Sequence, residues 1–390
     1  MSDNHDNLPP LASTLPVILP GRNSGALLVM FKRLCKWLLC LSLPFWAVAH
    51  ATSVVFLNPG NSTETFWVSY SQFMQAAARD LGLDLRILYA ERDPQNTLQQ
   101  ARELFQGRDK PDYLMLVNEQ YVAPQILRLS QGSGIKLFIV NSPLTLDQRE
   151  LIGQSRQNYS DWIGSMVGDD EEAGYRMLKE LLHKLGPVPA GHGIELLAFS
   201  GLKVTPAAQL RERGLRRALA EHPQVHLRQL VYGEWNRERA YRQAQQLLKR
   251  YPKTQLVWSA NDEMALGAMQ AARELGRKPG TDLLFSGVNS SPEALQALID
   301  GKLSVLEAGH FTLGGWALVA LHDDALGLDA RRLGGPDWQL SLFQALTPAQ
   351  ARQLLRLGDQ VGTRVDFRGL SAQGKPDSYR YPFGLQLLLR

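Results

Sequence analysis

Short apolar runs alternate with amphipathic helical stretches along most of the chain, and this alternation constrains the fold more than any other feature. In a first set, strand-like runs are expected at 54–57, 85–88, 114–117 and 137–140. A second set follows 162–167, with strand-like runs expected at 194–199, 227–231, 256–259, 283–286 and 304–306. Buried strands joined by helices through short connections favour parallel sheets covered on both faces. The sequence therefore predicts an α/β protein with two doubly wound parallel-sheet lobes.

The stretch 255–267, QLVWSANDEMALG, contains the clearest strand-to-helix junction. Residues 256–260 are apolar enough for a buried strand, Asn261 is a favoured helix N-cap, and Asp262 places negative charge in the first turn of the helix. Polar side chains at the carboxyl end of a parallel strand lie where open α/β sheets bind ligands. Asn261 and Asp262 are thus either caps alone or caps that also face a ligand.

The sequence NDEMALG at this junction resembles the type I periplasmic solute-binding proteins, the group of the ribose, galactose and autoinducer-2 receptors. The resemblance runs from about residue 53 to about residue 324. It implies two lobes joined by a hinge that the chain crosses three times, near Gly168, near His310 and after Ala325. The domains expected on this basis are an N-terminal lobe (52–168 with 310–325), a C-terminal lobe (169–309 with 326–368) and a tail (369–390).

Residues 1–51 precede the predicted lobes and have the features of an N-terminal extension with a signal peptide at 30–51. A basic segment, 32–36, precedes an apolar segment, 37–46, and the A-x-A pattern at 49–51 fits a cleavage site. The apolar segment is too short to span a membrane. We therefore expect export to the periplasm, with the mature chain beginning at Thr52; an uncleaved signal anchor is the alternative.

Composition excludes several kinds of function. Both cysteines, Cys35 and Cys40, lie in the predicted signal peptide, so no disulfide or thiol chemistry is expected in the mature chain. Removal of residues 1–51 lowers the net charge from +4 to +2, which gives no reason to expect nucleic acid as a partner. No phosphate-binding loop, nucleophile or metal-binding motif is present. The run His322-Asp323-Asp324 is interpreted as surface polar residues, and we expect no metal, no cofactor and no enzymatic activity.

Aromatic residues and one arginine are the first ligand-binding candidates, and the resemblance supplies their roles. Phe66 and Trp67 match positions at which the ribose-type receptors stack rings on a sugar, and Trp235 matches a second aromatic position in the other lobe. Arg211 resembles a ligand-binding arginine, whose planar guanidinium suits adjacent hydroxyls or a carboxylate. The alternative for the aromatic residues is ordinary core packing.

Polar candidates stand at strand ends: Asn118, Asn141, Asn261, Asp262 and Asn289. The resemblance adds His310, which matches a polar position at a crossing and either contacts the ligand or packs at the hinge. Asn141 and Asn289 depart from the resemblance, because the sugar receptors often carry aspartate there. Amide donors suit a ligand with acceptors, such as a sugar acid, unless Glu64 or Asp262 supplies the missing acceptors. Replacing Arg211 or Asn261 by alanine is expected to weaken binding by about 2–4 kcal/mol with the fold intact.

These features together predict a monomeric, non-enzymatic receptor that closes two lobes on a small polar, sugar-like ligand. The partner is either an inner-membrane ABC permease or a membrane sensor protein such as a histidine kinase, and the ligand-binding core looks the same for both. A DNA-binding repressor with the same core fold is a remote alternative, because it would need an N-terminal helix-turn-helix in place of the signal peptide.

Overall fold

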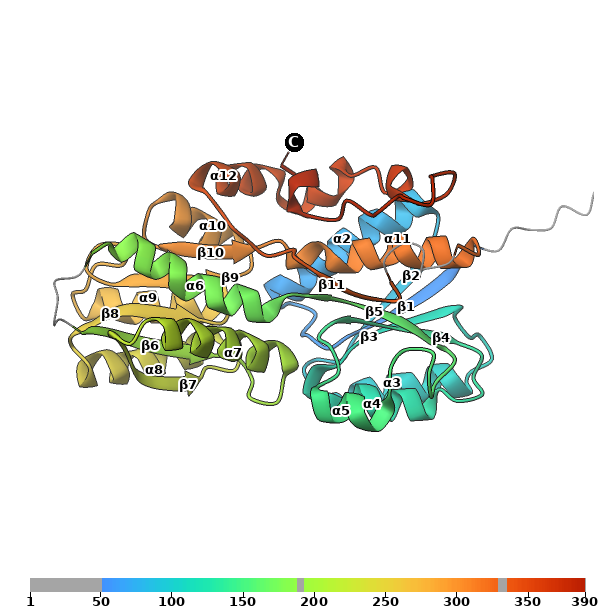
Figure 1. The fold of residues 1–390 in the computed structure, drawn as a ribbon, viewed down its shortest axis with the longest axis horizontal. Helices are drawn as coiled ribbons and strands as arrows, with labels where there is room; N and C mark the ends of the chain where they lie inside the picture. Colours follow the sequence, from blue (N-terminus) through green and yellow to red (C-terminus); the bar gives the residue numbers. More distant parts are fainter. Residues whose placement is uncertain (1–50, 188–192, 329–334, 390) are drawn as a thin grey trace, which may run out of the picture. The chain divides into compact units, whose positions relative to one another are not determined.

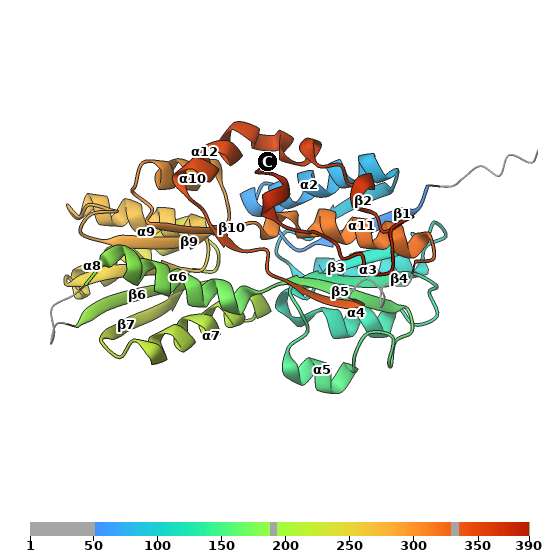
Figure 2. The same cartoon turned by 45° about the horizontal axis from the view of Figure 1, so that its top comes forward.

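Two six-stranded β-sheets form the framework of the structure, a computed structural model that describes residues 51–187, 193–328 and 335–389 (Figure 1). Helices cover both faces of each sheet, as two views of the ribbon show (Figures 1 and 2). The chain is therefore an α/β protein with two doubly wound lobes, as the alternation of apolar and amphipathic segments predicts.

The first sheet has the strand order β11-β5-β4-β3-β1-β2, and all its neighbouring pairs are parallel. Its strands are β1 (Ser53–Asn58), β2 (Asp84–Tyr89), β3 (Tyr113–Val117), β4 (Lys136–Asn141), β5 (Trp162–Gly168) and β11 (Asp337–Leu340). Strand β3 is buried along its whole length, which explains its continuous apolar sequence. The strand order reverses between β1 and β3, and ligands bind beyond the carboxyl ends of strands at such a reversal.

The second sheet has the corresponding order β12-β10-β9-β8-β6-β7, with β12 antiparallel to β10 and the other pairs parallel. Its strands are β6 (Ile194–Ser200), β7 (Val225–Tyr232), β8 (Thr254–Ser259), β9 (Leu284–Val288), β10 (Val305–Ala308) and β12 (Gln344–Ala345). The predicted junction at 255–267 is confirmed, because β8 leads into a helix whose first turn Asn261 caps by accepting a hydrogen bond from the Met264 amide at 2.9 Å.

The helices pack in pairs on the sheets. Those of the first lobe are α2 (Thr65–Leu81), α3 (Pro94–Gln106), α4 (Ala123–Leu129), α5 (Leu146–Ile152) and α11 (Leu313–Ala325). Those associated with the second sheet are α6 (Asp170–Leu185), α7 (Pro206–Glu221), α8 (Arg237–Arg250), α9 (Asp262–Glu274), α10 (Pro292–Ile299) and α12 (Pro348–Leu357). Helices α2 and α11 pack together, as do α6 with α7, α8 with α9 and α10 with α12.

Glycines bring α6 and α7 unusually close. A Cβ added at Gly174 would lie 2.1 Å from the Arg211 carbonyl oxygen, and one added at Gly214 would lie 1.9 Å from the Glu171 carbonyl oxygen. Any larger residue would push the two helices apart. This close approach places the start of α6 beside Arg211 of α7.

Within the described residues the chain passes between the two lobes four times, three times between the sheets and once more after α12. It passes from β5 to α6 at Gly168, from β10 to the 3₁₀ helix η2 (His310–Thr312) and α11, and from β11 to β12 through 341–343. The third crossing therefore comes later than the sequence suggests. The range 326–368 was expected to belong wholly to the C-terminal lobe, but its strand β11 pairs with β5 of the first sheet.

The C-terminal segment packs against the first lobe instead of forming a separate tail. After α12 packs on α10, the 3₁₀ helix η4 (Gly358–Arg364) returns to α2. The rings of Phe367 and Phe73 then meet at 5.3 Å, and the ring of Phe383 stacks on that of Trp316 at the same centroid distance. The 3₁₀ helices η5 (Arg368–Leu370) and η6 (Leu385–Leu387) complete the segment, whose Leu385 is only 1% exposed.

Asp323 explains how this segment is held. It is 1% exposed and accepts hydrogen bonds from the Ala372 amide at 2.7 Å, the Tyr381 hydroxyl at 2.7 Å and the Ser371 hydroxyl at 2.5 Å. Asp324 accepts a further hydrogen bond from the Tyr113 hydroxyl at 2.7 Å. The interpretation of these two aspartates as surface residues is therefore wrong, because both bind other elements of the fold.

Across the described ranges, no helix is both long and apolar enough to cross a membrane. The predicted signal peptide lies outside the described residues, apart from Ala51 at its end.

Candidate ligand-binding site

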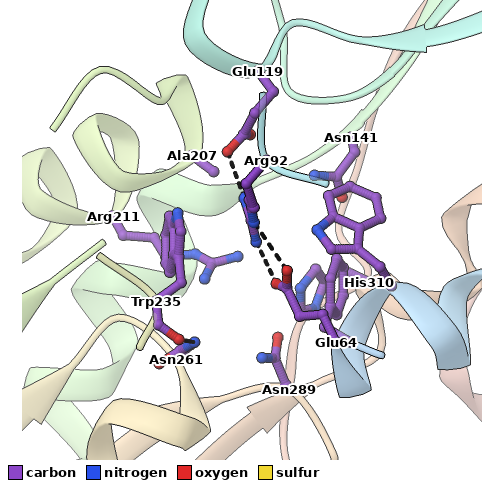
Figure 3. Close-up of a pocket in the computed structure, with 12 residues that line it drawn as sticks. Glu64, Arg92, Glu119, Asn141, Ala207, Arg211, Trp235, Asn261, Asn289 and His310 are labelled. Carbon is purple, nitrogen blue, oxygen red and sulfur yellow. Dashed lines mark hydrogen bonds and ion pairs between the residues drawn. The ribbon is translucent and has the colours of Figure 1, made fainter. Parts of the chain in front are cut away.

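One cavity lies where loops from both sheets meet (Figure 3). Its lining consists of Glu64, Phe66, Trp67, Arg92, Glu119, Asn141, Ala207, Arg211, Trp235, Asn261, Asn289 and His310. Most of these residues stand at or just after the carboxyl ends of β1 to β4 and β7 to β9. The cavity thus occupies the position at which doubly wound sheets bind ligands.

Each lobe contributes a tryptophan whose position depends on a glycine. A Cβ added at Gly60 would fall 1.9 Å from the ring of Trp67, and one added at Gly201 would fall 2.1 Å from the ring of Trp235. Both indoles therefore lie directly against the backbone that follows the first strand of their lobe, β1 or β6. The cavity thereby receives one aromatic ring from each lobe, as the sequence predicts.

Phe66 and His310 belong to a stack of three rings at a crossing between the lobes. The His310 ring lies 4.7 Å from that of Phe66 and 4.5 Å from that of Phe343. Burial, and secondarily the nearby charge of Arg211, holds the pKa of His310 well below its ordinary value, so the ring is neutral at physiological pH. No described residue bonds to its Nδ1 atom or to the Nε1 atom of Trp67, so each of these two buried rings has an unsatisfied polar atom beside the cavity.

Three charged residues form the polar wall of the first lobe, and Figure 3 shows Arg92 between Glu64 and Glu119. Arg92 contacts both Glu64 oxygens, with its Nε atom 2.9 Å from Oε2, and its Nη1 atom donates to Glu119 Oε1 at 2.7 Å. Burial raises the pKa of Glu119, and the charge of Arg92 opposes this shift. We call these three residues the Glu–Arg–Glu group; with both carboxylates ionised, its net charge is −1.

Arg211 reaches the cavity from the second lobe with two of its five N–H donors bonded to the protein. Its Nε atom donates to Asp170 Oδ1 at 2.8 Å and its Nη1 atom to the Ala260 carbonyl oxygen at 2.6 Å. Both side chains of this ion pair are buried, at 6% and 4% exposure. Among the described residues Nη2 has no hydrogen-bond partner, and the guanidinium extends toward the middle of the cavity (Figure 3). The pair is electrically neutral and offers donors to a ligand.

The three asparagines that line the cavity differ in their hydrogen bonds. Asn289 donates from Nδ2 to Asp262 Oδ1 at 2.9 Å, and the amides of Ser291 and Glu263 also donate to Asp262, so the asparagine must turn its amide group toward this acceptor. Its Oδ1 atom is left for the cavity, contrary to the expectation of a donor there. Asn141 makes no side-chain hydrogen bond to a described residue, which leaves both its donor and its acceptor available. Asn261 caps α9 and donates to the Trp235 carbonyl oxygen at 3.1 Å.

Four of the residues that line the cavity have a left-handed backbone conformation, which determines the direction of their side chains. Arg92, Asn141, Trp235 and Asn289 have φ values of 63°, 66°, 63° and 100°. Residues other than glycine rarely adopt this conformation, and asparagine adopts it more readily than most. Such strain gathers at binding sites, where the surrounding structure maintains it. The two asparagines thus suit the backbone as well as a ligand.

The structure brings eight of the ten predicted site residues to this cavity: Phe66, Trp67, Asn141, Arg211, Trp235, Asn261, Asn289 and His310. Asn118 and Asp262 do not line it. Asn118 donates to the Pro143 carbonyl oxygen at 2.8 Å and to Gln148 Oε1 at 2.7 Å, so it secures a loop, and Asp262 orients Asn289.

Four lining residues were not among the predicted site residues. The sequence suggests Glu64 only as an alternative acceptor, and it does not single out Arg92, Glu119 or Ala207. The same strand-end argument could have found two of them, because Arg92 follows β2 and Glu119 follows β3.

A family model for the periplasmic binding protein domain matches residues 54–325. Among curated proteins, the ribose import binding protein of Escherichia coli K12 is 25% identical over 68% of this chain and 81% of its own length. The galactofuranose-binding protein of the same strain is 22% identical over 66% of this chain and 76% of its own length.

Solved structures share the fold. The crystal structure of a periplasmic sugar-binding protein from Pseudomonas fluorescens is 96% identical and covers 87% of this chain and all of its own, with a TM-score of 0.83. The binding protein of the arabinose ABC transporter from Shewanella sp. ANA-3, solved with α- and β-L-arabinofuranose bound, is 24% identical over 78% of this chain and 95% of its own, with a TM-score of 0.66. The chain therefore belongs to the type I periplasmic binding proteins, in the family that includes sugar-binding receptors.

Proposed function

We propose that this protein is a periplasmic receptor that closes its two lobes on a small uncharged sugar and presents it to an inner-membrane ABC permease. The observation that supports this most strongly is the cavity itself. It takes an indole from each lobe, Trp67 and Trp235, together with polar atoms that no described residue satisfies. A sugar ring has apolar C–H faces and hydroxyls at its edge, and this combination of surfaces complements both.

The balance of charges supports an uncharged ligand. Arg211 is neutralised by Asp170, His310 is neutral, and the two glutamates beside Arg92 leave an excess of negative charge. A sugar acid would bring a carboxylate into this excess. The sequence suggested that Asn141 and Asn289 favour a sugar acid, because their amide groups can donate to a carboxylate. The Asn289 amide donates to Asp262 instead, which weakens that suggestion further.

The relatives support delivery to a permease over signalling. The ribose import binding protein and the binding protein of the arabinose ABC transporter are both named as components of transport systems. Nothing in the site itself distinguishes a permease from a membrane sensor, since both would recognise the closed lobes. We favour import because these relatives match most of the chain.

A thermal-shift screen of residues 52–390 tests the binding proposal, with neutral aldoses, sugar acids and polyols as ligands. A ligand at 100 times its Kd stabilises the folded state by about 2.7 kcal/mol, which a melting curve resolves readily. We expect at least one neutral sugar to raise the melting temperature, with calorimetry confirming a single site. If no neutral sugar stabilises the protein at millimolar concentration, or only acids do, the proposal is wrong.

A further inference from the structure

We propose that the Glu–Arg–Glu group of Glu64, Arg92 and Glu119 sets the charge selectivity of the cavity, with Arg92 as its determining residue. This inference rests on the proposed function, because it concerns which sugars the same cavity accepts. It adds a role for three side chains that stand on three different loops of the first lobe.

The geometry makes this group a single unit. Three of the five N–H donors of Arg92 are bonded to carboxylate oxygens, two of them to Glu64 in a side-by-side arrangement. Gln120 donates to the Arg92 carbonyl oxygen at 3.0 Å, which fixes the loop that carries the guanidinium. The side chains of Arg92, Glu64 and Glu119 are 23%, 22% and 8% exposed, so none is an ordinary surface charge.

The unbonded atoms of the group define what it can recognise. Glu119 Oε2 accepts no hydrogen bond from the described residues, and two donors of Arg92 are left. One free acceptor beside two free donors fits neighbouring hydroxyls, each of which both donates and accepts. A ligand carboxylate would meet Glu119, and a ligand ammonium would meet Arg92. Because the net charge of the group is −1, it disfavours a ligand carboxylate, and the positive charge of Arg92 weakens the attraction of an ammonium to the two glutamates.

Changing one member should therefore shift selectivity in a defined direction. Arg92→Met takes the net charge of the group from −1 to −2 and removes the positive charge that an ammonium would meet. Glu119→Gln takes the net charge to 0 with almost no change in shape. The first change favours an amino sugar and the second favours a sugar acid, in each case relative to a neutral sugar.

The experiment measures dissociation constants by calorimetry for native residues 52–390, Arg92→Met, Glu119→Gln and a control. The probes are the neutral sugars D-ribose, L-arabinose and D-galactose, the amine D-galactosamine and the acid D-galacturonate. Arg237→Met is the matched control, because Arg237 also binds a glutamate through two nitrogens, at 2.5 and 2.7 Å from Glu293, but lies outside the cavity. Urea unfolding reports whether each variant is folded.

We expect the affinity ratio of galactosamine to the best neutral sugar to rise at least about tenfold in Arg92→Met, and the ratio for galacturonate to rise similarly in Glu119→Gln. The control should change neither ratio. If Arg92→Met does not fold, Glu119→Gln alone decides. Ratios within about twofold of native in every folded variant would overturn this inference and leave the proposed function standing. Failure of the native protein to bind any neutral sugar would overturn both.

Discussion

Replacement of Arg211 by methionine should destabilise the fold as well as weaken ligand binding. Arg211 provides the hydrogen bonds at 2.8 Å to Asp170 and at 2.6 Å to the Ala260 carbonyl oxygen. Asp170 is 3% exposed at the start of α6, and no other described residue pairs with its charge. The expectation that an Arg211 variant leaves the fold intact is therefore revised.

The size of the effect follows from the carboxylate left behind. Breaking a buried ion pair by removing one partner costs about 3–5 kcal/mol, a large fraction of a typical unfolding free energy of about 5–15 kcal/mol. In the double variant Arg211→Met/Asp170→Asn the charge is gone, and we expect at least half of the lost stability to return. Urea unfolding at pH 7, followed by circular dichroism, measures both values.

The pH dependence provides a second readout. Burial raises the pKa of Asp170 above its ordinary value, and Arg211 opposes this rise, so the pKa should rise further without Arg211. An acid whose pKa is higher in the folded state binds more protons there, so stability falls as pH rises through that pKa. The deficit of Arg211→Met should thus shrink between pH 7 and pH 5. An unfolding free energy within about 1 kcal/mol of native at pH 7, or no recovery in the double variant, would refute this reasoning.

Three further predictions concern the cavity and the N-terminus. Gly201→Ala places a methyl group on the indole of Trp235 and should lower sugar affinity at least about tenfold, as calorimetry would show, whereas unchanged affinity would mean that the indole does not touch the ligand. Asn261→Ala removes the N-cap of α9 and the bond to the Trp235 loop, so urea unfolding should show a loss of about 1–2 kcal/mol together with weaker binding; an unaltered midpoint would argue against the cap. N-terminal sequencing of the exported protein should begin at Thr52, and recovery of uncleaved residues 1–51 from the cytoplasm would contradict export.

The sheets and the strand-end residues were predictable because both follow from local patterns. Periodicity identified the core strands, the rule that ligands bind at the carboxyl ends of parallel strands identified Asn261, and the family resemblance identified Asn141 and Asn289. The same rule also selected Asn118 and Asp262, which turn back to bond neighbouring loops. Position at a strand end therefore predicts proximity to the site, while the direction of a side chain depends on which partners its loop provides.

Two parts of the structure had no such local signal. Strands β11 and β12 have four and two residues, and η4 to η6 are 3₁₀ helices, so apart from α12 the C-terminal segment shows no period long enough to detect. Its packing depends on single contacts such as Phe367 on Phe73. Arg92 lies in a loop whose charged sequence is typical of the protein surface. Its side chain points into the cavity because its backbone is left-handed, which the sequence does not indicate.

The most direct test of the central claim is a crystal structure of residues 52–390 with the neutral sugar that binds most tightly in the screen. We predict that the sugar ring occupies the cavity between Trp67 and Trp235, with hydroxyls bonded to Arg211 Nη2 and Glu119 Oε2. A sugar bound elsewhere on the protein, with this cavity filled only by water, would contradict the account.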